Sequence, residues 1–374
     1  MKNLTSLALI CFVLISGFAL AQPLAVYVSD AGNFNTGPWQ IAKFDQNGNF
    51  EGALMNTDDD IVWPQDIIFL DNEDAVLISN LGPAGNISKH SWSSGDFIED
   101  FADGLGGPTR MKVGPDGLLY VLQWSNSVNK VRRYDLDGTF IDEFTSVGVP
   151  QSIGIDWDAA GDLYVSSYGT SVVRKFNGTT GMDEGLFINS GLNGPTNIFF
   201  EASGDMIVFD YNSGIIKRFD SAGNFVEDLI TGLLGPEGFA FFPNGDILIG
   251  NGGNGAIKRY DSSYNFLGNF VEPGILLTPN AIVIRDDVPL SVPVNELNAF
   301  FVTPTIGSNF RFNTKVTDAY EKLGVYDTIG KLVETVKIAE NSVWDASRLR
   351  EGTYFLVAVK DGKKASQKII ISKK

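Results

Sequence analysis

Cysteine and histidine are nearly absent from the 374-residue chain, which contains one of each, Cys11 and His90. Cys11 lies in a segment that we expect to be removed, so the mature protein is predicted to have no disulfide and no thiol chemistry. A single histidine excludes zinc or copper sites built from several imidazoles. An exported chain without disulfides has to be stabilised by its hydrophobic core or by a metal ion.

The first residues have the composition of a secretory signal peptide. Lys2 is followed by a mostly apolar run from Leu4 to Leu20. The small residues of Ala19-Leu20-Ala21 fit cleavage before Gln22. The run is short for a membrane anchor, no stop-transfer charges follow it, and no later segment is long and apolar enough to cross a bilayer. We therefore predict that residues 1–21 are a signal peptide and that the mature protein has no transmembrane segment.

Basic side chains are scarce over most of the chain, which has 28 Lys and Arg against 45 Asp and Glu. Residues 22–295 carry 36 acidic and 14 basic side chains, a net charge of −22, whereas residues 296–374 carry 9 and 13, a net charge of +4. The acidic body argues against nucleic acid as a partner, because phosphate binding requires Lys and Arg. It suits solubility outside the cell and the attraction of divalent cations. The change of sign near residue 295 predicts a domain boundary.

One sequence motif recurs along the acidic part of the chain. It consists of a proline, an apolar strand, a Gly-Asp turn, a second apolar strand, a polar loop, and then a basic residue, an aromatic residue and Asp. The prolines that begin the copies are Pro64, Pro108, Pro150, Pro195, Pro236 and Pro279. A period of about 43 residues with short β-rich runs is typical of propeller blades of four strands each.

The number of blades follows from the ends of the repeat region. Residues 22–55 contain strands two to four of a copy without its first strand, and residues 278–285 contain a first strand alone. Together they complete one blade, which closes the ring and removes its exposed edges. We therefore predict an all-β fold whose residues 22–285 form a six-bladed β-propeller, with the strand near Ala25–Val28 beside the strand near Ala281–Ile284.

The clearest copy runs from residue 194 to residue 230, and its residues 194–220 resemble an NHL repeat, a family of six-bladed propellers. The resemblance covers residues 22–285 and is specific for the fold but not for a function. A WD-repeat assignment fits less well, because Trp157-Asp158 is the only such dipeptide in the repeat region and does not end a third strand.

The repeat stops after residue 285. Residues 286–297 contain two aspartates and two prolines with little periodicity, and we expect a linker. Residues 298–374 contain short alternating strands that fit a small β-sandwich.

This tail resembles the C-terminal sorting domain of the type IX secretion system. The matching residues are Leu323–Val333, Trp344–Leu349, Glu351–Val357 and Lys368–Lys374. The Pro-Asn-Pro element that often opens the family is missing, and Val302-Thr303-Pro304-Thr305 stands in its place. The resemblance implies the secretion machinery as a partner, removal of the tail, and a secreted or cell-surface product. A generic adhesion-like β-domain is the alternative.

Polar and aromatic residues recur at the loops that open on one face of a propeller. These are the loops before strand one and after strand two of each blade, and the residues directly after the repeat prolines belong to them. The candidate ligand-binding residues are Gln65, Arg110, Trp124, Gln151, Tyr168, Asn197, Asp210, Tyr211 and Asn251. Aromatic rings beside amides can stack on a carbohydrate or a protein segment while the amides form hydrogen bonds with it. Packing of these rings between blades is the alternative.

Glu237 and Asn280 directly follow their prolines, which resembles the position of the metal ligands in gluconolactonase-like propellers, and Asp66 and Asn197 could complete an all-oxygen site. Asp66, Glu237 and Asn280 are the candidate ligands of a Ca²⁺ or Mg²⁺ ion. A metal at this position would support the alternative function, a propeller hydrolase or lyase. Asn and Asp are also ordinary turn residues, so turn formation and solvation are the other interpretation.

The single histidine bears on catalysis. His90 aligns with the aromatic residue of strand three in the other copies, so we expect it to pack away from the channel mouth. A lyase of the streptogramin-cleaving type would need a histidine base at the mouth. The sequence therefore favours a monomeric ligand-binding or interaction module over an enzyme.

Overall fold

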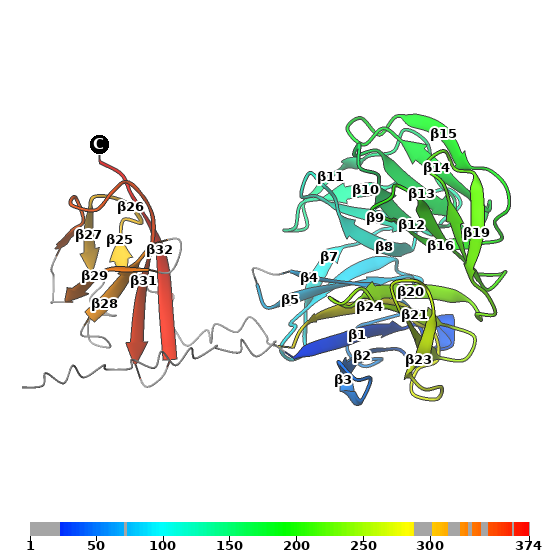
Figure 1. Ribbon diagram of the computed structural model, residues 1–374, viewed down its shortest axis with the longest axis horizontal. Helices are drawn as coiled ribbons and strands as arrows, with labels where there is room; N and C mark the ends of the chain where they lie inside the picture. Colours follow the sequence, from blue (N-terminus) through cyan, green and yellow to red (C-terminus); the bar gives the residue numbers. More distant parts are fainter. Residues whose placement is uncertain are drawn as a thin grey trace, which may run out of the picture. The chain divides into compact units, whose positions relative to one another are not determined.

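The computed structural model describes residues 23–70, 73–287, 301–312, 322–327, 331–337, 343–360 and 363–373. The predicted signal peptide and most of the predicted linker lie outside these residues. The chain divides into two compact units, Met1–Leu290 and Ser291–Lys374, both built from β-strands (Figure 1). Among the described residues, the only helical element is the short 3-10 helix η1 (Phe34–Thr36).

The first unit contains six four-stranded antiparallel sheets, which we call blades 1 to 6. In blade order, strand one is β24 (Pro279–Asp286), β4 (Pro64–Leu70), β8 (Pro108–Val113), β12 (Ser152–Trp157), β16 (Pro195–Phe200) and β20 (Pro236–Phe241). Strand two is β1 (Leu24–Asp30), β5 (Ala75–Asn80), β9 (Leu119–Gln123), β13 (Leu163–Ser167), β17 (Met206–Asp210) and β21 (Ile247–Asn251). Strand three is β2 (Gln40–Asp45), β6 (Asn86–His90), β10 (Arg132–Tyr134), β14 (Val172–Phe176), β18 (Ile215–Phe219) and β22 (Ala256–Tyr260). Strand four is β3 (Phe50–Asn56), β7 (Phe97–Ala102), β11 (Phe140–Glu143), β15 (Asp183–Ile188), β19 (Phe225–Ile230) and β23 (Phe266–Val271).

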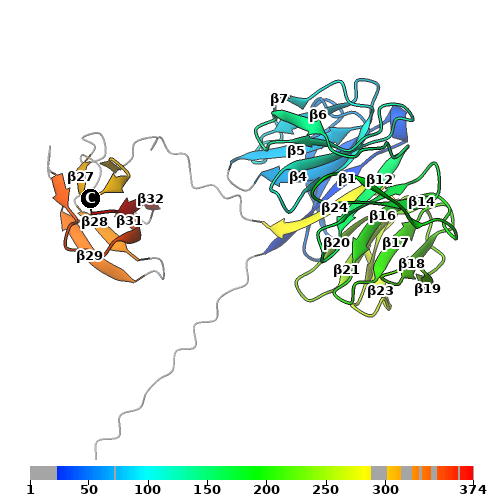
Figure 2. The ribbon, with the colours of Figure 1, turned by 90° about the horizontal axis from the view of Figure 1, so that it is seen from above.

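The blades form a closed ring around a central channel. Strand one of each blade contacts strand one of the next, in the cycle β4, β8, β12, β16, β20, β24 and back to β4. β24 also pairs with β1, with Ile282 opposite Val28 and Ile284 opposite Val26, as predicted (Figure 2). The predicted all-β fold with a six-bladed propeller is confirmed. Because the first and last strands of the propeller, β1 and β24, share one blade, the ring closes without an unpaired strand at its two ends.

Hydrophobic cores lie between neighbouring blades. Phe209 of blade 5 and Ile249 of blade 6, for example, are fully buried in the same cluster. Strand two is buried along most of its length because both of its faces meet other blades. His90 ends β6, is fully buried, and lies edge-on to Phe97 at a ring-centroid distance of 5.7 Å. The predicted packing role of His90 is confirmed.

The register of blade 4 differs from the sequence alignment. In the other five blades the repeat proline lies opposite the last residue of strand two, as Pro195 lies opposite Asp210. In blade 4 Ser152 holds this position, opposite Ser167, and Pro150 lies two residues earlier. In blade 4, Ile153 and Gly154 therefore hold the positions that Thr196 and Asn197 hold in blade 5. The assignment of Gln151 to that position was wrong, because Pro150 belongs to the preceding loop.

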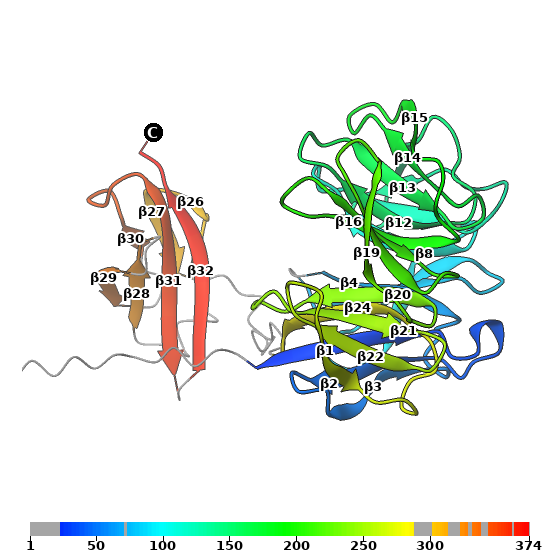
Figure 3. The same cartoon turned by 45° about the vertical axis from the view of Figure 1, so that its right-hand side comes forward.

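The second unit contains two sheets, as predicted for the tail. One is formed by β25 (Val302–Thr303), β27 (Asn309–Phe312) and β30 (Val343–Asp345). The other is formed by β26 (Ile306–Gly307), β32 (Lys363–Ile371), β31 (Gly352–Lys360), β28 (Lys322–Tyr326) and β29 (Leu332–Lys337), with β31 and β32 running side by side (Figure 3). Their shared core includes Phe310 and Trp344, whose ring centroids are 5.4 Å apart.

Candidate functional site

A cavity of about 280 Å³ lies at one mouth of the propeller channel, and we call it the cup. Strand one of five blades supplies its floor residues, which are Gln65, Ile153, Thr196, Glu237 and Asn280. Loops supply its walls, which are Phe34, Trp63, Leu81, Trp124, Tyr168 and Tyr211. Because the walls and the floor come from all six blades, the closed ring itself creates this site.

Three of the wall residues form a continuous arc of rings. Trp124, Tyr168 and Tyr211 each follow the last residue of strand two, in blades 3, 4 and 5. The ring centroids of Trp124 and Tyr168 are 5.3 Å apart, and those of Tyr168 and Tyr211 are 6.0 Å apart. Phe34 and Trp63 form a second pair at 5.8 Å. Offset and edge-on contacts of this kind hold rings in fixed orientations.

Glycines before the repeat prolines make room for this arc. At Gly235 an added Cβ would lie 2.7 Å from Cζ of Tyr211, and at Gly194 it would lie 2.8 Å from Cε2 of Tyr168. Both glycines have positive φ angles, which side chains disfavour. Each tyrosine ring therefore lies against the backbone of the next blade. These rings pack between blades and also line the cup, so their role in ligand binding stays a prediction.

Arg110 crosses the channel below the cup. It belongs to β8, is 5 % exposed, and its guanidinium donates to the backbone oxygens of Gln65 and Asn280. Its Nε donates to Oδ1 of Asn197 at 3.1 Å, and its Nη2 donates to Oε1 of Glu237 at 2.8 Å. These partners come from β4, β24, β16 and β20. One side chain thus joins strand one of five blades, and the sixth, β12, has Gly154 at this level.

Two buried carboxylates face the single guanidinium. Glu237 forms the ion pair with Arg110, and Asp66 accepts hydrogen bonds from the backbone amides of Met111 at 2.7 Å and Ile67 at 2.9 Å. Burial raises the pKa of both carboxyl groups, and the charge of Arg110 opposes that rise. The negative charge of Asp66 raises the pKa of Glu237 further. The group of three therefore carries one more negative than positive charge when both carboxyls are ionised.

A divalent metal ion does not fit among Asp66, Glu237 and Asn280 as they are arranged. The guanidinium of Arg110 already forms the ion pair with Glu237, its charge acts on Asp66 as well, and the oxygens of Asp66 accept two backbone amides. Across the described residues, no group of three or more His, Cys, Asp or Glu side chains is placed to hold a metal ion. A Ca²⁺ or Mg²⁺ ion at these residues would have to displace Arg110, so we derive no chemistry from one.

Two predicted ligand-binding residues, Asp210 and Asn251, form hydrogen bonds that stabilise the fold of their own blades. Oδ1 of Asp210 accepts the amide of Asn193 at 2.6 Å, and Oδ1 of Asn251 accepts the amide of Leu234 at 2.6 Å. Each bond ties the end of strand two to the loop before strand one of the same blade. Asp30, Asn80 and Gln123 make the same bond in blades 1, 2 and 3.

The predicted residues therefore separate into three groups. Those that line the cup are Gln65, Trp124, Tyr168, Tyr211, Glu237 and Asn280. Those in the channel below it are Asp66, Arg110 and Asn197. Asp210, Asn251 and Gln151 do not line the cup.

Five residues of the cup were not among the predicted ligand-binding or metal-binding residues. Ile153 was missed because of the two-residue shift in blade 4, and Thr196 and Leu81 occupy repeat positions that were predicted in other blades. Phe34 lies in η1, and Trp63 precedes a repeat proline with a φ angle of 54°. Both rings lie on loops of irregular conformation, and the repeat pattern does not predict the conformation of such loops.

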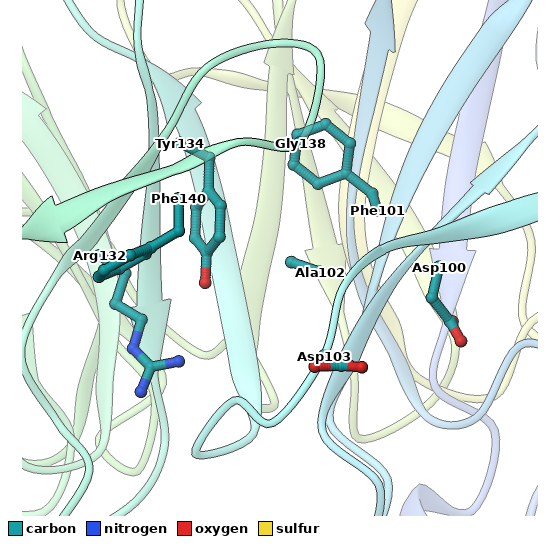
Figure 4. Close-up of a pocket in the computed structure, with 8 residues that line it drawn as sticks. All are labelled: Asp100, Phe101, Ala102, Asp103, Arg132, Tyr134, Gly138 and Phe140. Carbon is teal, nitrogen blue, oxygen red and sulfur yellow. The ribbon is translucent and has the colours of Figure 1, made fainter.

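A second hollow of about 410 Å³ lies between the outer strands of blades 2 and 3. Its lining includes Phe101 and Asp103 on one side and Arg132, Tyr134 and Phe140 on the other (Figure 4). It contains none of the predicted site residues. The ring of Phe101 lies 6.1 Å from that of Tyr134, as in an ordinary contact between blades. We therefore take the cup as the candidate site.

Comparison with known proteins identifies the tail. Residues 306–372 match the family described as the secretion system C-terminal sorting domain. The chain therefore ends in a sorting domain of the type IX secretion system, which engages the secretion machinery and sends the protein to the cell surface or the medium. In the described part of the chain, no helix has the length and apolar character needed to cross a membrane. No curated protein matches the chain.

Solved structures resemble the propeller. A chain of a nidogen/laminin complex is 13% identical, with a TM-score of 0.57, over 70% of this chain and 98% of that chain. A protein of unknown function from Bacteroides caccae is 16% identical, with a TM-score of 0.55, over 70% of this chain and 98% of that chain. At these identities the likeness shows the fold alone.

Proposed function

We propose that this protein is an exported, monomeric binding module whose cup holds a ligand. The observation that carries the proposal is the cup itself, a cavity of about 280 Å³ in which five aromatic side chains surround a small polar floor. Cavities that are mostly apolar, with a few convergent polar groups, are the usual form of small-ligand sites. The sorting domain delivers this cavity to the outside of the cell, where its ligand would be met.

The rigidity of the cup supports binding. Its aromatic walls are held by contacts with one another and with glycines of the next blade, and its floor is held by the hydrogen bonds of Arg110. A preformed site loses little conformational entropy when a ligand enters. A carbohydrate or a segment of a protein could each place an apolar face on the rings and polar groups on Gln65, Glu237 and Asn280.

A hydrolase or lyase function has less support. The metal on which it would depend does not fit around Arg110, and His90 is buried in β6 away from the cup. A carboxylate such as Glu237 could serve as a base, but it is held in the ion pair with Arg110 at 2.8 Å. Binding is therefore the function that this geometry supports best.

The proposal is tested by titrating the mature protein with a panel of monosaccharides, amines and short peptides while tryptophan fluorescence is measured. We expect a saturable change with at least one class of probe and its loss in Trp124→Leu. Trp157→Leu is the matched control, because Trp157 lies outside the cup. Equal responses from the two variants, or no response to any class, would contradict the proposal.

A further inference from the structure

The charge of the cup is concentrated in one group. Among the residues that line it, Glu237 is the only charged side chain. Arg110 lies below the floor, and its charge is shared between Glu237 and Asp66. When both carboxyls are ionised, Arg110, Glu237 and Asp66 together carry one surplus negative charge. Burial and the negative charge of Glu237 raise the pKa of the Tyr211 hydroxyl to about 12, which fits a negative potential in the cup.

The rings of the cup add to this preference. The face of an aromatic ring is the negative part of its quadrupole and attracts cations. Phe34, Trp63, Trp124, Tyr168 and Tyr211 meet in one small cavity. Several rings around one space form an enclosure for a cation, whereas a sugar ring is usually stacked on a flatter platform. The acidic body, with a net charge of −22 over residues 22–295, attracts cations from a distance.

Two polar atoms of the cup residues lack partners. Oδ1 of Asn280 and Nε1 of Trp63 are buried, and neither has a hydrogen-bond partner among the described residues. Asn280 is 2 % exposed. A buried polar atom without a partner is unfavourable by roughly 1–3 kcal/mol, so a ligand that supplies the missing bonds gains affinity. Asn280 requires a donor, and Trp63 requires an acceptor.

From these observations we infer that the ligand of the cup is an organic cation, with an alkylammonium or guanidinium group directed at Glu237 and Asn280. This inference rests on the proposed binding function and specifies its ligand. The cationic group would donate to Oε2 of Glu237 and Oδ1 of Asn280, its apolar stem would lie against the rings, and a carbonyl or hydroxyl of the same ligand would accept from Nε1 of Trp63. At about 280 Å³ the cup takes one side chain or one small amine and not an oligosaccharide.

The inference is tested by calorimetric titration of the mature protein with four probes. Nα-acetyl-lysine amide represents a basic side chain of a partner, and phenethylamine represents a free amine. Nα-acetyl-norleucine amide is the neutral counterpart of the lysine probe, and methyl glucoside is a neutral sugar. We expect the lysine probe to bind roughly tenfold or more tightly than the norleucine probe, as a charge-assisted hydrogen bond predicts. Comparison of the lysine probe with phenethylamine distinguishes a protein partner from a free amine.

Two variants complete the test. Glu237→Gln is expected to weaken the lysine probe by roughly tenfold or more, and the matched variant Glu272→Gln, at an exposed carboxylate outside the cup, is expected to change nothing. If Glu237→Gln fails to fold, Trp124→Leu tests the same site, and we expect it to weaken the binding of the lysine probe as well. If the norleucine or glucoside probe binds as tightly as the lysine probe and this binding is lost in Trp124→Leu, the inference that the ligand is a cation is wrong. The proposed binding function would then still hold. Absence of binding by all four probes would contradict both.

Discussion

Arg110 shows how one residue can fix the centre of a propeller. Its guanidinium is buried, and its hydrogen bonds reach strand one of four other blades. Removing one partner of a buried ion pair leaves an uncompensated charge in a medium that solvates it poorly. The residue that the sequence placed on the rim is therefore a support for the floor of the cup.

Arg110→Met is expected to destabilise the propeller by roughly 3–5 kcal/mol, because Glu237 and Asp66 lose their counter-charge. Chemical denaturation followed by circular dichroism measures the change. The control is Arg174→Met, which removes a partly exposed ion pair with Asp183 and should cost at most about 1 kcal/mol. Similar losses in the two variants would contradict the role given to Arg110.

Glu237→Gln tests whether the single positive charge of Arg110 is enough to stabilise both buried carboxylates, Glu237 and Asp66. Burial raises the pKa of Glu237 in the folded state above its unfolded value. The stability that this group contributes is present below the unfolded pKa and is lost as pH rises through the folded pKa. Gln cannot ionise, so at neutral pH the variant should be as stable as the wild type or more stable, and its stability should vary less with pH.

Denaturation curves between pH 4 and pH 8 measure this difference. A loss of several kcal/mol in Glu237→Gln at neutral pH would show that the ion pair with Arg110 outweighs the effect of burial.

The sequence predicted about half of the cup, and the reason is positional. Trp124, Tyr168 and Tyr211 follow strand two at equivalent repeat positions, so period alone finds them. Phe34 and Trp63 lie on loops whose conformation depends on tertiary contacts. The sequence placed Arg110 at the mouth but gave no indication that its side chain crosses the channel.

At the scale of strands, hydroxyl groups connect neighbouring blades. Oγ of Ser79 donates to the oxygen of Thr109 at 2.6 Å, and Oγ1 of Thr109 donates to the oxygen of Ser152 at 2.7 Å. Ser29, Ser166 and Thr196 make corresponding bonds to Pro64, Thr196 and Pro236. Each bond satisfies a buried carbonyl of strand one in the next blade, which the sheet ladders leave available.

Ser79→Ala is therefore expected to lower the free energy of unfolding by roughly 1–2 kcal/mol, because the carbonyl of Thr109 loses a buried donor. The matched control is Ser221→Ala in an exposed turn, which should change stability by less than about 0.5 kcal/mol. Thermal and chemical denaturation of both variants give the comparison, and equal values would show that these hydroxyls contribute nothing to the contact between blades.

The repeat predicted strand order well and register less well. A one-residue slip reverses which side chains face the core, so the alternation of apolar residues fixes most strands. Proline was used to align the copies, and that works where proline begins strand one. In blade 4 Pro150 lies in the loop and Ser152 begins the strand, so the alignment by proline was shifted by two residues. A shift of two residues keeps the same side chains facing the core, so the alternation of apolar and polar residues does not reveal it.

At the scale of the whole molecule, the sorting domain and the propeller that carries the proposed binding site are separate compact units. The sorting domain has its own core, formed by residues such as Phe310, Val325, Leu356 and Ile369. The propeller closes through β24 and β1 without any residue of the tail. The period of the repeat and the change in charge predicted both parts, because each is a property of many residues. The predicted boundaries at 285 and 297 remain predictions.

Deletion of residues 296–374 is expected to leave the melting temperature of the propeller unchanged within about 2 °C, because no strand of its sheets is lost. The truncated protein should fail to reach the cell surface. Calorimetry on the purified protein and immunodetection on intact cells measure the two outcomes. Surface display of the truncated protein at the normal level would contradict the sorting role of the tail.

The central claim is that the cup binds a ligand, and one spectrum tests it most directly. The chain contains six tryptophans, and each gives one indole signal in a ¹H–¹⁵N correlation spectrum. Titration with Nα-acetyl-lysine amide should shift the signals of Trp63 and Trp124, which line the cup, and leave those of Trp92 and Trp157 in place. Unchanged signals of Trp63 and Trp124 at saturating probe, or larger shifts at Trp92 and Trp157, would contradict the account.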